Sequence, residues 1–297
     1  MINNLLIGQI EKELNEKIHE IKEIKSGYSR SVFLLNGTYY LKISVSSNKD
    51  LKNKIEVDFL KNSNLDFVPK IIYSDFTKNV FPFAYHVEKK INGDSLLLKW
   101  PTFTEDEKKQ LLNNLIHKTE VIHSFSQGVP SNQSCLKSLI NEFDCFLDKN
   151  NYLGNDRINY LKKLREIIPT LFKDAKTGLI HNDLHFNNIL IDNSKKIYFI
   201  DFEEIGEAFV EREYDPINRM SRCPKLYNFE PDIYLNPADF KDIIKYIYNY
   251  SNEVSKDNFF DRLLFFDCLH SMEWLPLYPK HEIYNDVLFN KSKKLLL

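Results

Sequence analysis

The sequence predicts an α+β protein in two lobes: a small lobe with an antiparallel β-sheet, then a larger, mainly helical lobe. Short apolar runs separated by turn-forming residues dominate the first 88 residues, a pattern typical of antiparallel strands. Longer stretches with apolar residues at helical spacing dominate the remainder. We therefore expect an N-terminal lobe over residues 1–88 and a C-terminal lobe over residues 89–297.

The composition is that of a protein with a sizeable core and little charge bias. The chain has 297 residues, of which 43% are hydrophobic, and its formal net charge is -2. This length suits one large domain or two lobes. A net charge so close to zero gives no global attraction to nucleic acid or to a membrane surface. We expect neither as a partner, and we expect a monomer or a weak dimer.

Cysteine use and the first residues favour a cytoplasmic protein. The four cysteines form no Cys-x-x-Cys pair, so neither a disulfide framework nor a zinc site is expected: Cys135, Cys145, Cys223 and Cys268. Residues 1–10 lack the basic start and the long apolar run of a signal peptide. No stretch has the length and apolarity of a membrane span.

The predicted sheet follows a short amphipathic helix over residues 10–21. Asn36-Gly37 lies between two β-favouring runs, which is a strong hairpin signal. Apolar runs near residues 68–73 and 83–88 complete a five-stranded antiparallel sheet. Residues 50–62 have the spacing of a helix, and four residues would form its apolar stripe: Leu51, Ile55, Phe59 and Leu60.

The second lobe has helix signals along most of its length. A capping box at Thr104 starts a helix that runs to about Phe125. Helices follow over residues 133–149 and 156–172, and Pro169 ends or kinks the second of them. The C-terminal part is also helical in pattern. We interpret its aromatic residues as core rather than as a ligand cage: Trp274, Tyr278 and Tyr284.

A second hairpin is predicted between residues 179 and 204. Its two apolar runs, residues 189–191 and 197–200, flank the turn-forming residues 192–195. Because the ends of a hairpin lie side by side, polar residues before and after it could converge at one end. Those residues are Asp183, Asn188 and Asp201.

These three side chains suit the handling of a magnesium nucleotide. Mg²⁺ prefers a few oxygen ligands and keeps phosphates and waters as the rest. Asn188 offers a carbonyl oxygen and Asp201 a carboxylate, while Asp183 could orient an attacking hydroxyl. The spacing His-x-Asp-x-x-x-x-Asn, followed by a strand that ends in Asp-Phe, is typical of kinase-type phosphoryl transfer.

At this motif the chain resembles the aminoglycoside phosphotransferases and the choline-kinase-like small-molecule kinases. Members often show His-Gly-Asp-Leu-His-Pro-Gly-Asn where this chain has His-Asn-Asp-Leu-His-Phe-Asn-Asn over residues 181–188. The resemblance implies a two-lobed protein-kinase-like fold and ATP or GTP as the phosphate donor. It implies catalysis by Asp183 and Mg²⁺ ligation by Asn188 and Asp201. His185, in the same loop, is either a nearby contact or a packed residue.

The resemblance also implies a phosphate-binding lysine and its partner. Lys42 would grip the nucleotide phosphates, although a solvated strand lysine is the simpler interpretation of that residue taken alone. Glu56, fourteen residues further on, would be its ion-pair partner, with Asp58 as a rival. Glu88 begins the expected hinge, where family members hydrogen-bond the purine through backbone groups.

The first hairpin would fold over the triphosphate. Backbone N–H groups and the hydroxyls of Ser29 and Ser31 could approach phosphate oxygens there. The loop has a single glycine, Gly27, so an ordinary turn is an equally good interpretation of this segment taken alone.

Departures from the protein-kinase pattern argue against a regulated protein kinase. Asn182 stands where protein kinases have an arginine, Glu203 stands where they have the glycine after Asp-Phe, and no Ala-Pro-Glu motif follows. Asp215 fits the structural aspartate that family members have at the end of this segment, and His123 fits a packing histidine.

The acceptor is expected to be an aminoglycoside-type antibiotic, which would make the chain an antibiotic-resistance kinase. Five carboxylates would attract a polycation, although a solvated acidic segment explains them equally well: Glu203, Glu204, Glu207, Glu211 and Glu213. One alternative is a metabolic kinase of choline, a sugar or an amino alcohol. Another is a nucleotide-binding protein without catalytic activity.

Overall fold

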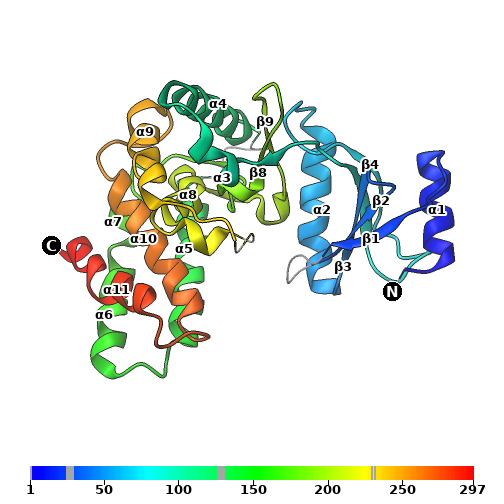
Figure 1. The fold of residues 1–297 in the computed structure, drawn as a ribbon. Helices are drawn as coiled ribbons and strands as arrows, with labels where there is room; N and C mark the ends of the chain where they lie inside the picture. The colour runs from blue at the N-terminus through cyan, green and yellow to red at the C-terminus, as the bar shows by residue number, and fades with distance from the viewer. Residues whose placement is uncertain (1, 25–29, 126–130, 229, 231) are drawn as a thin grey trace. The chain divides into compact units, whose positions relative to one another are not determined.

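The structure is a computed structural model that describes residues 2–24, 30–125, 131–228, 230 and 232–297. It contains two compact units (Figure 1). The first unit comprises Met1–Leu96 and Asn187–Ile205, and the second comprises Leu97–Phe186 and Gly206–Leu297. The second predicted hairpin therefore belongs to the first unit, although the chain reaches it only after a long passage through the second.

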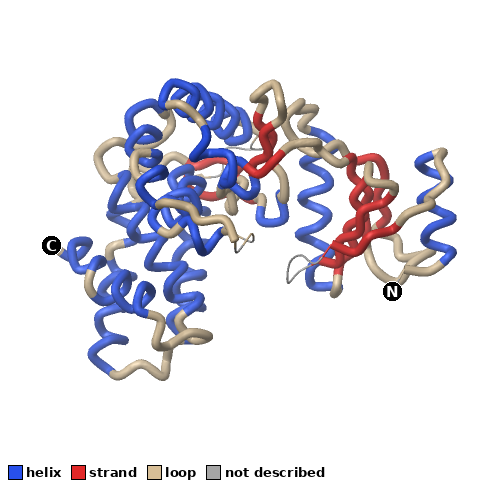
Figure 2. The backbone as a smooth tube through the Cα atoms, in the orientation of Figure 1, coloured by secondary structure: helices blue, strands red, loops and turns tan. Residues whose placement is uncertain are grey.

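The first unit is built on the predicted five-stranded antiparallel sheet, shown among the red strands of Figure 2. Its strand order is β1-β2-β3-β5-β4. Asn36 and Gly37, between β2 and β3, both have positive φ, of 47° and 66°. A tight hairpin turn of this kind requires that conformation, which explains the Asn-Gly pair. The strands are β1 (Ile21–Ile24), β2 (Arg30–Leu35), β3 (Tyr39–Ser44), β4 (Ile71–Asp75) and β5 (Tyr85–Lys89).

The first helix lies earlier in the chain than the sequence predicted. Helix α1 spans Asn4–Leu14, and residues 21–24 are already strand β1, so the prediction of a helix over residues 10–21 is wrong beyond Leu14. The side chain of Asn3 caps the helix by accepting from the N–H of Leu6. Asn15 ends it in the left-handed conformation, a common way to close a helix.

The two faces of the sheet have different chemistry. One face is apolar and packs on α1 through Leu6 and Ile10. Successive side chains of a strand point to opposite faces, so Lys42 on β3 lies on the other face from Leu41 and Ile43. Helix α2 (Ser47–Asn62) lies on the opposite side of the sheet from α1 (Figure 1) and contacts β3 and β4.

Helix α2 buries only part of the predicted apolar stripe. Leu60 is buried, but Leu51 and Ile55 are 68% and 44% exposed, so these two side chains do not face the core. The buried positions are Asn53, Glu56, Val57 and Leu60. The helix meets a sheet face that carries Lys42, and turning Glu56 inward supplies a counter-charge there. The pairing of Glu56 with Lys42 accounts for this orientation, which the apolar spacing of the helix alone does not predict.

The predicted second hairpin is confirmed as β8 (Ile189–Ile191) and β9 (Ile197–Phe199), to which β6 (Asp94–Ser95) adds a third strand. Asp192 fixes the turn, because one carboxylate oxygen accepts from the backbone N–H groups of Ser194 and Lys196. Phe199 N donates to the carbonyl of Phe67 at 2.8 Å. That bond ties the hairpin to the rest of the first unit.

The second unit is mainly helical (Figure 2). Among its described residues, the strands β7 (Thr177–Ile180) and β10 (Gly206–Phe209) pair antiparallel. The capping box at Thr104 is present, and Pro169 follows a helix break as predicted. The helices are α4 (Glu105–His123), α5 (Asn132–Lys149), α6 (Asn155–Glu166), α7 (Ile168–Leu171), α8 (Asp215–Arg222), α9 (Ile243–Tyr250), α10 (Phe259–Trp274) and α11 (Glu282–Phe289), with α3 (Leu96–Lys99) at the unit boundary.

The core of the second unit is aromatic. Phe172 contacts Phe209, Phe265 and Phe266 with ring centroids 4.7 to 5.4 Å apart, which packs α10 against α7 and β10. Within the described residues, we find no helix with the length and apolarity that crossing a bilayer requires.

Candidate active site

Lys42 lies between two carboxylates in the first unit. Its Nζ is 3.0 Å from Glu88 Oε1 and 3.7 Å from Glu56 Oε1. The side chain is nearly buried, and so are both carboxylates. The structure therefore brings Glu56 to Lys42, while Asp58 lies exposed on the same helix. It also adds Glu88 as a second partner, which the sequence reasoning had assigned to the hinge.

The buried groups of this cluster stabilise one another in their ionised forms. Burial would lower the pKa of Lys42, but the charges of Glu88 and Glu56 outweigh burial and raise it. Burial would raise the pKa of Glu88, but Lys42 and His86 together lower it to about 2. Lys42 and Glu88 are therefore both ionised at neutral pH, and a charged lysine is available to a phosphate.

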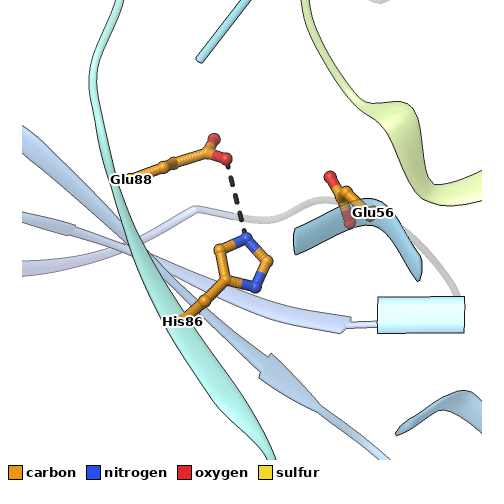
Figure 3. A group of neighbouring side chains, drawn as sticks. All are labelled: Glu56, His86 and Glu88. Carbon is orange, nitrogen blue, oxygen red and sulfur yellow. Dashed lines mark ion pairs between the residues drawn. The ribbon is translucent and has the colours of Figure 1, made fainter. Parts of the chain in front are cut away.

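Figure 3 shows His86 and Glu88 extending from the same strand toward Glu56 on α2. His86 Nε2 is 3.6 Å from Glu88 Oε2. One ligand atom from each of the three side chains lies within 4.8 Å of the others, which is close enough for a metal centre. Lys42 and Arg30 already balance the two carboxylates, however, and a divalent ion would add repulsion between buried cations. The cluster is better described as an ion-pair network.

Arg30 is a member of this network that the sequence reasoning missed. It is the first residue of β2, and its guanidinium forms an ion pair with Glu56 Oε2. Its Nε also lies 3.7 Å from Glu203 Oε2. A signal for it existed: Val32 pairs with Lys42 across the sheet, and Arg30, two residues earlier on the strand, shares the face of Val32.

The two predicted metal ligands lie at the same end of the second hairpin. Asn188 ends the 3₁₀ helix η2 (Phe186–Asn188), and Asp201 follows β9. A 2.9 Å hydrogen bond from Ile200 N to the carbonyl of Asn188 joins the two segments. Asp201 is exposed and has φ 64°, a left-handed conformation that is uncommon for a residue other than glycine.

The charge of Asp201 reaches the lysine cluster. It helps to raise the pKa of both Lys42 and Arg30, after the larger effects of burial and of their direct carboxylate partners. The described residues interacting here include two cations, Arg30 and Lys42. They also include four carboxylates: Glu56, Glu88, Asp201 and Glu203. This excess of negative charge and the oxygen donors of Asn188 and Asp201 fit a hard divalent cation.

Asp183 belongs to the second unit, in the loop after β7. Glu213, in the 3₁₀ helix η4 (Val210–Tyr214), holds the backbone of this loop by hydrogen bonds. Its carboxylate accepts from the backbone N–H of His181 at 2.7 Å and from that of Asn182 at 3.3 Å. Asn182 has φ 68° and is therefore in the left-handed conformation, like Asp201. Glu213 was predicted only as part of an acidic segment, and its holding of this loop was missed.

His123 lies between Glu213, which holds the loop, and Glu253. Its Nδ1 lies 2.5 Å from Glu253 Oε2 and its Nε2 lies 3.5 Å from Glu213 Oε2. Burial would lower the pKa of His123, but hydrogen bonds to Glu213 and Glu253 raise it to about 9. A Cβ at Gly178 would meet His123 Cβ at 3.0 Å, so a glycine there allows β7 to approach α4.

The other polar residues of the predicted site have varied positions. His185 Nε2 lies 3.8 Å from Asp183 Oδ2, and the His185 ring contacts Tyr227. Ser31 lies in β2 and is half-buried. Gly27 and Ser29 lie outside the described residues.

The acidic residues after Asp201 have partners within the chain. Glu203 lies beside Arg30, Glu204 is 2.5 Å from Lys52 Nζ, and Glu211 forms a buried pair with Arg262 at 2.6 Å. Glu207 is exposed on β10. Glu203 and Glu204 belong to the first unit, and Glu207 and Glu211 belong to the second.

A group of polar and aromatic side chains in contact begins on α8 in the second unit. Asp215 is buried and 3.0 Å from Arg219 Nε. Arg219 Nη1 also lies 2.9 Å from His270 Nε2. The charge of Arg219 interacts with Asp183 as well. An array of ring contacts continues from His270: Trp274, Tyr278, His281 and Tyr284. Tyr278 is 51% exposed, so the prediction that this ring is core is wrong.

A family model described as "Phosphotransferase enzyme family" matches residues 20–210, well over half of the chain. The chain belongs to this family. The match spans the lysine strand, the hairpin with Asn188 and Asp201, and the loop with Asp183.

Solved aminoglycoside phosphotransferases share the fold of this family member along its whole length. The streptomycin–ATP ternary complex of APH(2")-IIa has a TM-score of 0.70 at 16% identity, with 100% of both chains covered. The GDP complex of aminoglycoside 2'-phosphotransferase-IIIa has a TM-score of 0.67 at 17% identity, covering 99% of this chain and 100% of the other. A putative aminoglycoside phosphotransferase from Ralstonia eutropha JMP134 has a TM-score of 0.61 at 10% identity, covering 98% and 94%. The predicted α+β kinase-like fold is thereby confirmed.

Proposed function

We propose that this chain transfers the γ-phosphate of ATP or GTP to a hydroxyl of a small molecule. One observation carries the proposal: Lys42 is paired with Glu56 in the same unit in which one hairpin end carries Asn188 and Asp201. A lysine for phosphate and two oxygen ligands for a metal are the parts that kinase-type phosphoryl transfer needs.

The residues would divide the work as follows. Lys42, charged and held by Glu56 and Glu88, would bind phosphate oxygens. Asn188 and Asp201 would hold Mg²⁺, which supplies charge neutralisation on the phosphates when bound. Asp183 would orient the acceptor hydroxyl and take its proton. The reaction then depends mainly on positioning and electrostatic stabilisation.

The acceptor we propose is an aminoglycoside-type antibiotic. Solved structures with the same fold are complexes with gentamicin, streptomycin and kanamycin. In this chain, the ring faces of Trp274, Tyr278 and Tyr284 belong to a contact network that leads through His270 to Arg219, whose charge interacts with Asp183. Ring faces attract protonated amines.

A metabolic kinase of choline or another amino alcohol is the second candidate, because the same ring faces suit a quaternary ammonium group. The third possibility, nucleotide binding without catalysis, predicts no product with any acceptor.

One assay separates these candidates. Purified protein is incubated with ATP or GTP, Mg²⁺ and a panel of aminoglycosides, choline, amino alcohols and sugars, and phosphorylated products are identified by mass. We expect a product with at least one aminoglycoside and none when Asp183 is replaced by alanine. A product with choline alone would assign the metabolic role. Nucleotide binding without any product would contradict catalysis.

A further inference from the structure

Arg30 contacts two acidic residues that belong to different parts of the proposed nucleotide site. Its side chain is 6% exposed and projects from the start of β2. On one side it pairs with Glu56 of α2, and on the other its Nε lies 3.7 Å from Glu203 Oε2. Glu203 belongs to the 3₁₀ helix η3 (Phe202–Glu204), which begins directly after Asp201.

Glu56 is shared between two cations. Its Oε2 faces Arg30, while its Oε1 lies 3.7 Å from Lys42 Nζ. The position of Arg30 therefore determines how much of the Glu56 carboxylate remains for Lys42. An arginine is well suited to this role, because its planar guanidinium presents donors in several fixed directions and keeps its charge when buried.

The segment after Asp201 needs anchoring. The backbone of Asp201 has φ 64°, and a non-glycine residue keeps such a conformation only where its surroundings enforce it. In the described part of the chain, α2 holds this segment by a ring contact between Phe59 and Phe202 at 5.2 Å and by the pair Lys52–Glu204. Arg30 adds a contact to Glu203 from the sheet side.

These anchors differ in strength. The side chains of Lys52 and Glu204 are 45% and 38% exposed, so solvent screens that pair and its contribution is small. Arg30 and Glu203 are 6% and 17% exposed. Removing one member of a buried pair leaves the other charge without compensation, which is costly.

We propose that Arg30 is a positioning residue that couples the lysine cluster to the placement of Asp201, by holding Glu56 and Glu203 at the same time. The inference rests on the proposed function, since Lys42 and Asp201 matter to catalysis only if the chain binds a metal nucleotide. Loss of Arg30 should therefore change the Mg²⁺ requirement of the enzyme as well as its stability.

The test compares Arg30→Met with Arg30→Lys, Glu203→Gln and the matched control Lys52→Met. For each variant we would measure the Mg²⁺ concentration for half-maximal activity, KM for the nucleotide, kcat and Tm. Residues that orient metal ligands typically contribute about tenfold or more to metal affinity. We expect Arg30→Met to raise the Mg²⁺ requirement about tenfold, Arg30→Lys to recover part of it, and Lys52→Met to stay within about twofold of wild type.

Coupling predicts non-additivity. If Arg30 acts through Glu203, the double variant Arg30→Met/Glu203→Gln should have nearly the Mg²⁺ requirement of Arg30→Met alone. A lower Tm with an unchanged Mg²⁺ requirement would reduce Arg30 to a structural residue and overturn the proposal. An equal effect of Lys52→Met would overturn it too. If Arg30→Met does not fold, Arg30→Lys and Glu203→Gln still provide the comparison.

A second measurement separates this inference from the proposed function. Hydrogen exchange of residues 197–205 in the protein without nucleotide should be faster in Arg30→Met than in Lys52→Met. That result would support the coupling even if no acceptor were phosphorylated. Equal exchange in the two variants would overturn the coupling and leave the proposed phosphotransferase activity untouched.

Discussion

The two units hold their proposed catalytic groups with different kinds of buried charge. In the first unit, Lys42 and Arg30 are cations over the whole physiological pH range and face Glu56 and Glu88. In the second, the loop of Asp183 rests on Glu213, whose cationic neighbour is His123. A histidine loses its charge within reach of ordinary buffers, whereas a paired lysine or arginine does not. We therefore expect the second unit to lose stability at alkaline pH and the first unit to lose stability at acid pH.

The largest expected effect separates chemistry from nucleotide binding. Asp183→Asn should lower kcat by about 10²- to 10⁴-fold, the usual contribution of a general base, with nucleotide affinity within about twofold of wild type. Lys42→Met is the counterpart and should weaken nucleotide binding. Turnover by steady-state kinetics and affinity by calorimetry would check both. Equal losses of affinity in the two variants would remove the proposed division of roles.

Glu213→Gln tests the support of the Asp183 loop. The amide keeps the shape of the side chain but removes the charge that faces two backbone N–H groups and His123. We expect a loss of roughly 3 kcal/mol in unfolding free energy, together with lower kcat. Chemical denaturation would measure it, with the exposed Glu207→Gln as the control. A Glu213 variant as stable and active as that control would show that the loop has other support.

The stability lost at alkaline pH should come from deprotonation of His123. Its pKa is raised from 6.5 to about 9 in the folded protein. The stabilisation is therefore complete below about pH 6.5 and is lost as pH rises through 9. A shift of this size corresponds to roughly 3 kcal/mol. Unfolding free energies measured from pH 6 to 10 should fall more steeply for wild type than for His123→Gln. Parallel curves would exclude His123 as the source.

Part of the stability lost at acid pH should come from protonation of Glu88. This is the smallest of the predicted effects. Its folded pKa is lowered from 4.5 to about 2. Its stabilisation is present above about pH 4.5 and is lost as pH falls toward 2. Other carboxylates titrate in the same range, so the difference attributable to Glu88 should be roughly 1–3 kcal/mol. Glu88→Gln should flatten the acid limb of the stability curve, measured by denaturation from pH 2 to 6.

Much of the fold could be predicted because its signals are local. Asn36-Gly37 predicts a turn from its own conformational preferences, and Thr104 with Glu107 forms a capping box within four residues. The second hairpin was readable for the same reason. Asn188 and Asp201 could be placed together because the two ends of a hairpin must meet.

The failures depend on contacts distant in sequence. Helix α2 turns Glu56 inward because a lysine on another element faces it, and apolar spacing within the helix contains no such information. Arg30 was missed because its partners lie 26 and 173 residues away, at Glu56 and Glu203. In the sequence, Glu213 is one of several closely spaced acidic residues. Its role depends on hydrogen bonds from the backbone of residues 181 and 182, which the sequence does not reveal.

The most direct test of the proposed site is Mn²⁺ binding in the presence of a non-hydrolysable ATP or GTP analogue, followed by electron paramagnetic resonance. Asp201→Asn removes the proposed carboxylate ligand, and Asp58→Asn removes an exposed carboxylate from α2 as a control. We predict that nucleotide-dependent Mn²⁺ binding is retained in Asp58→Asn and lost or strongly weakened in Asp201→Asn. Equal Mn²⁺ binding by the two variants would contradict the proposal that Asp201 holds the metal of a bound nucleotide.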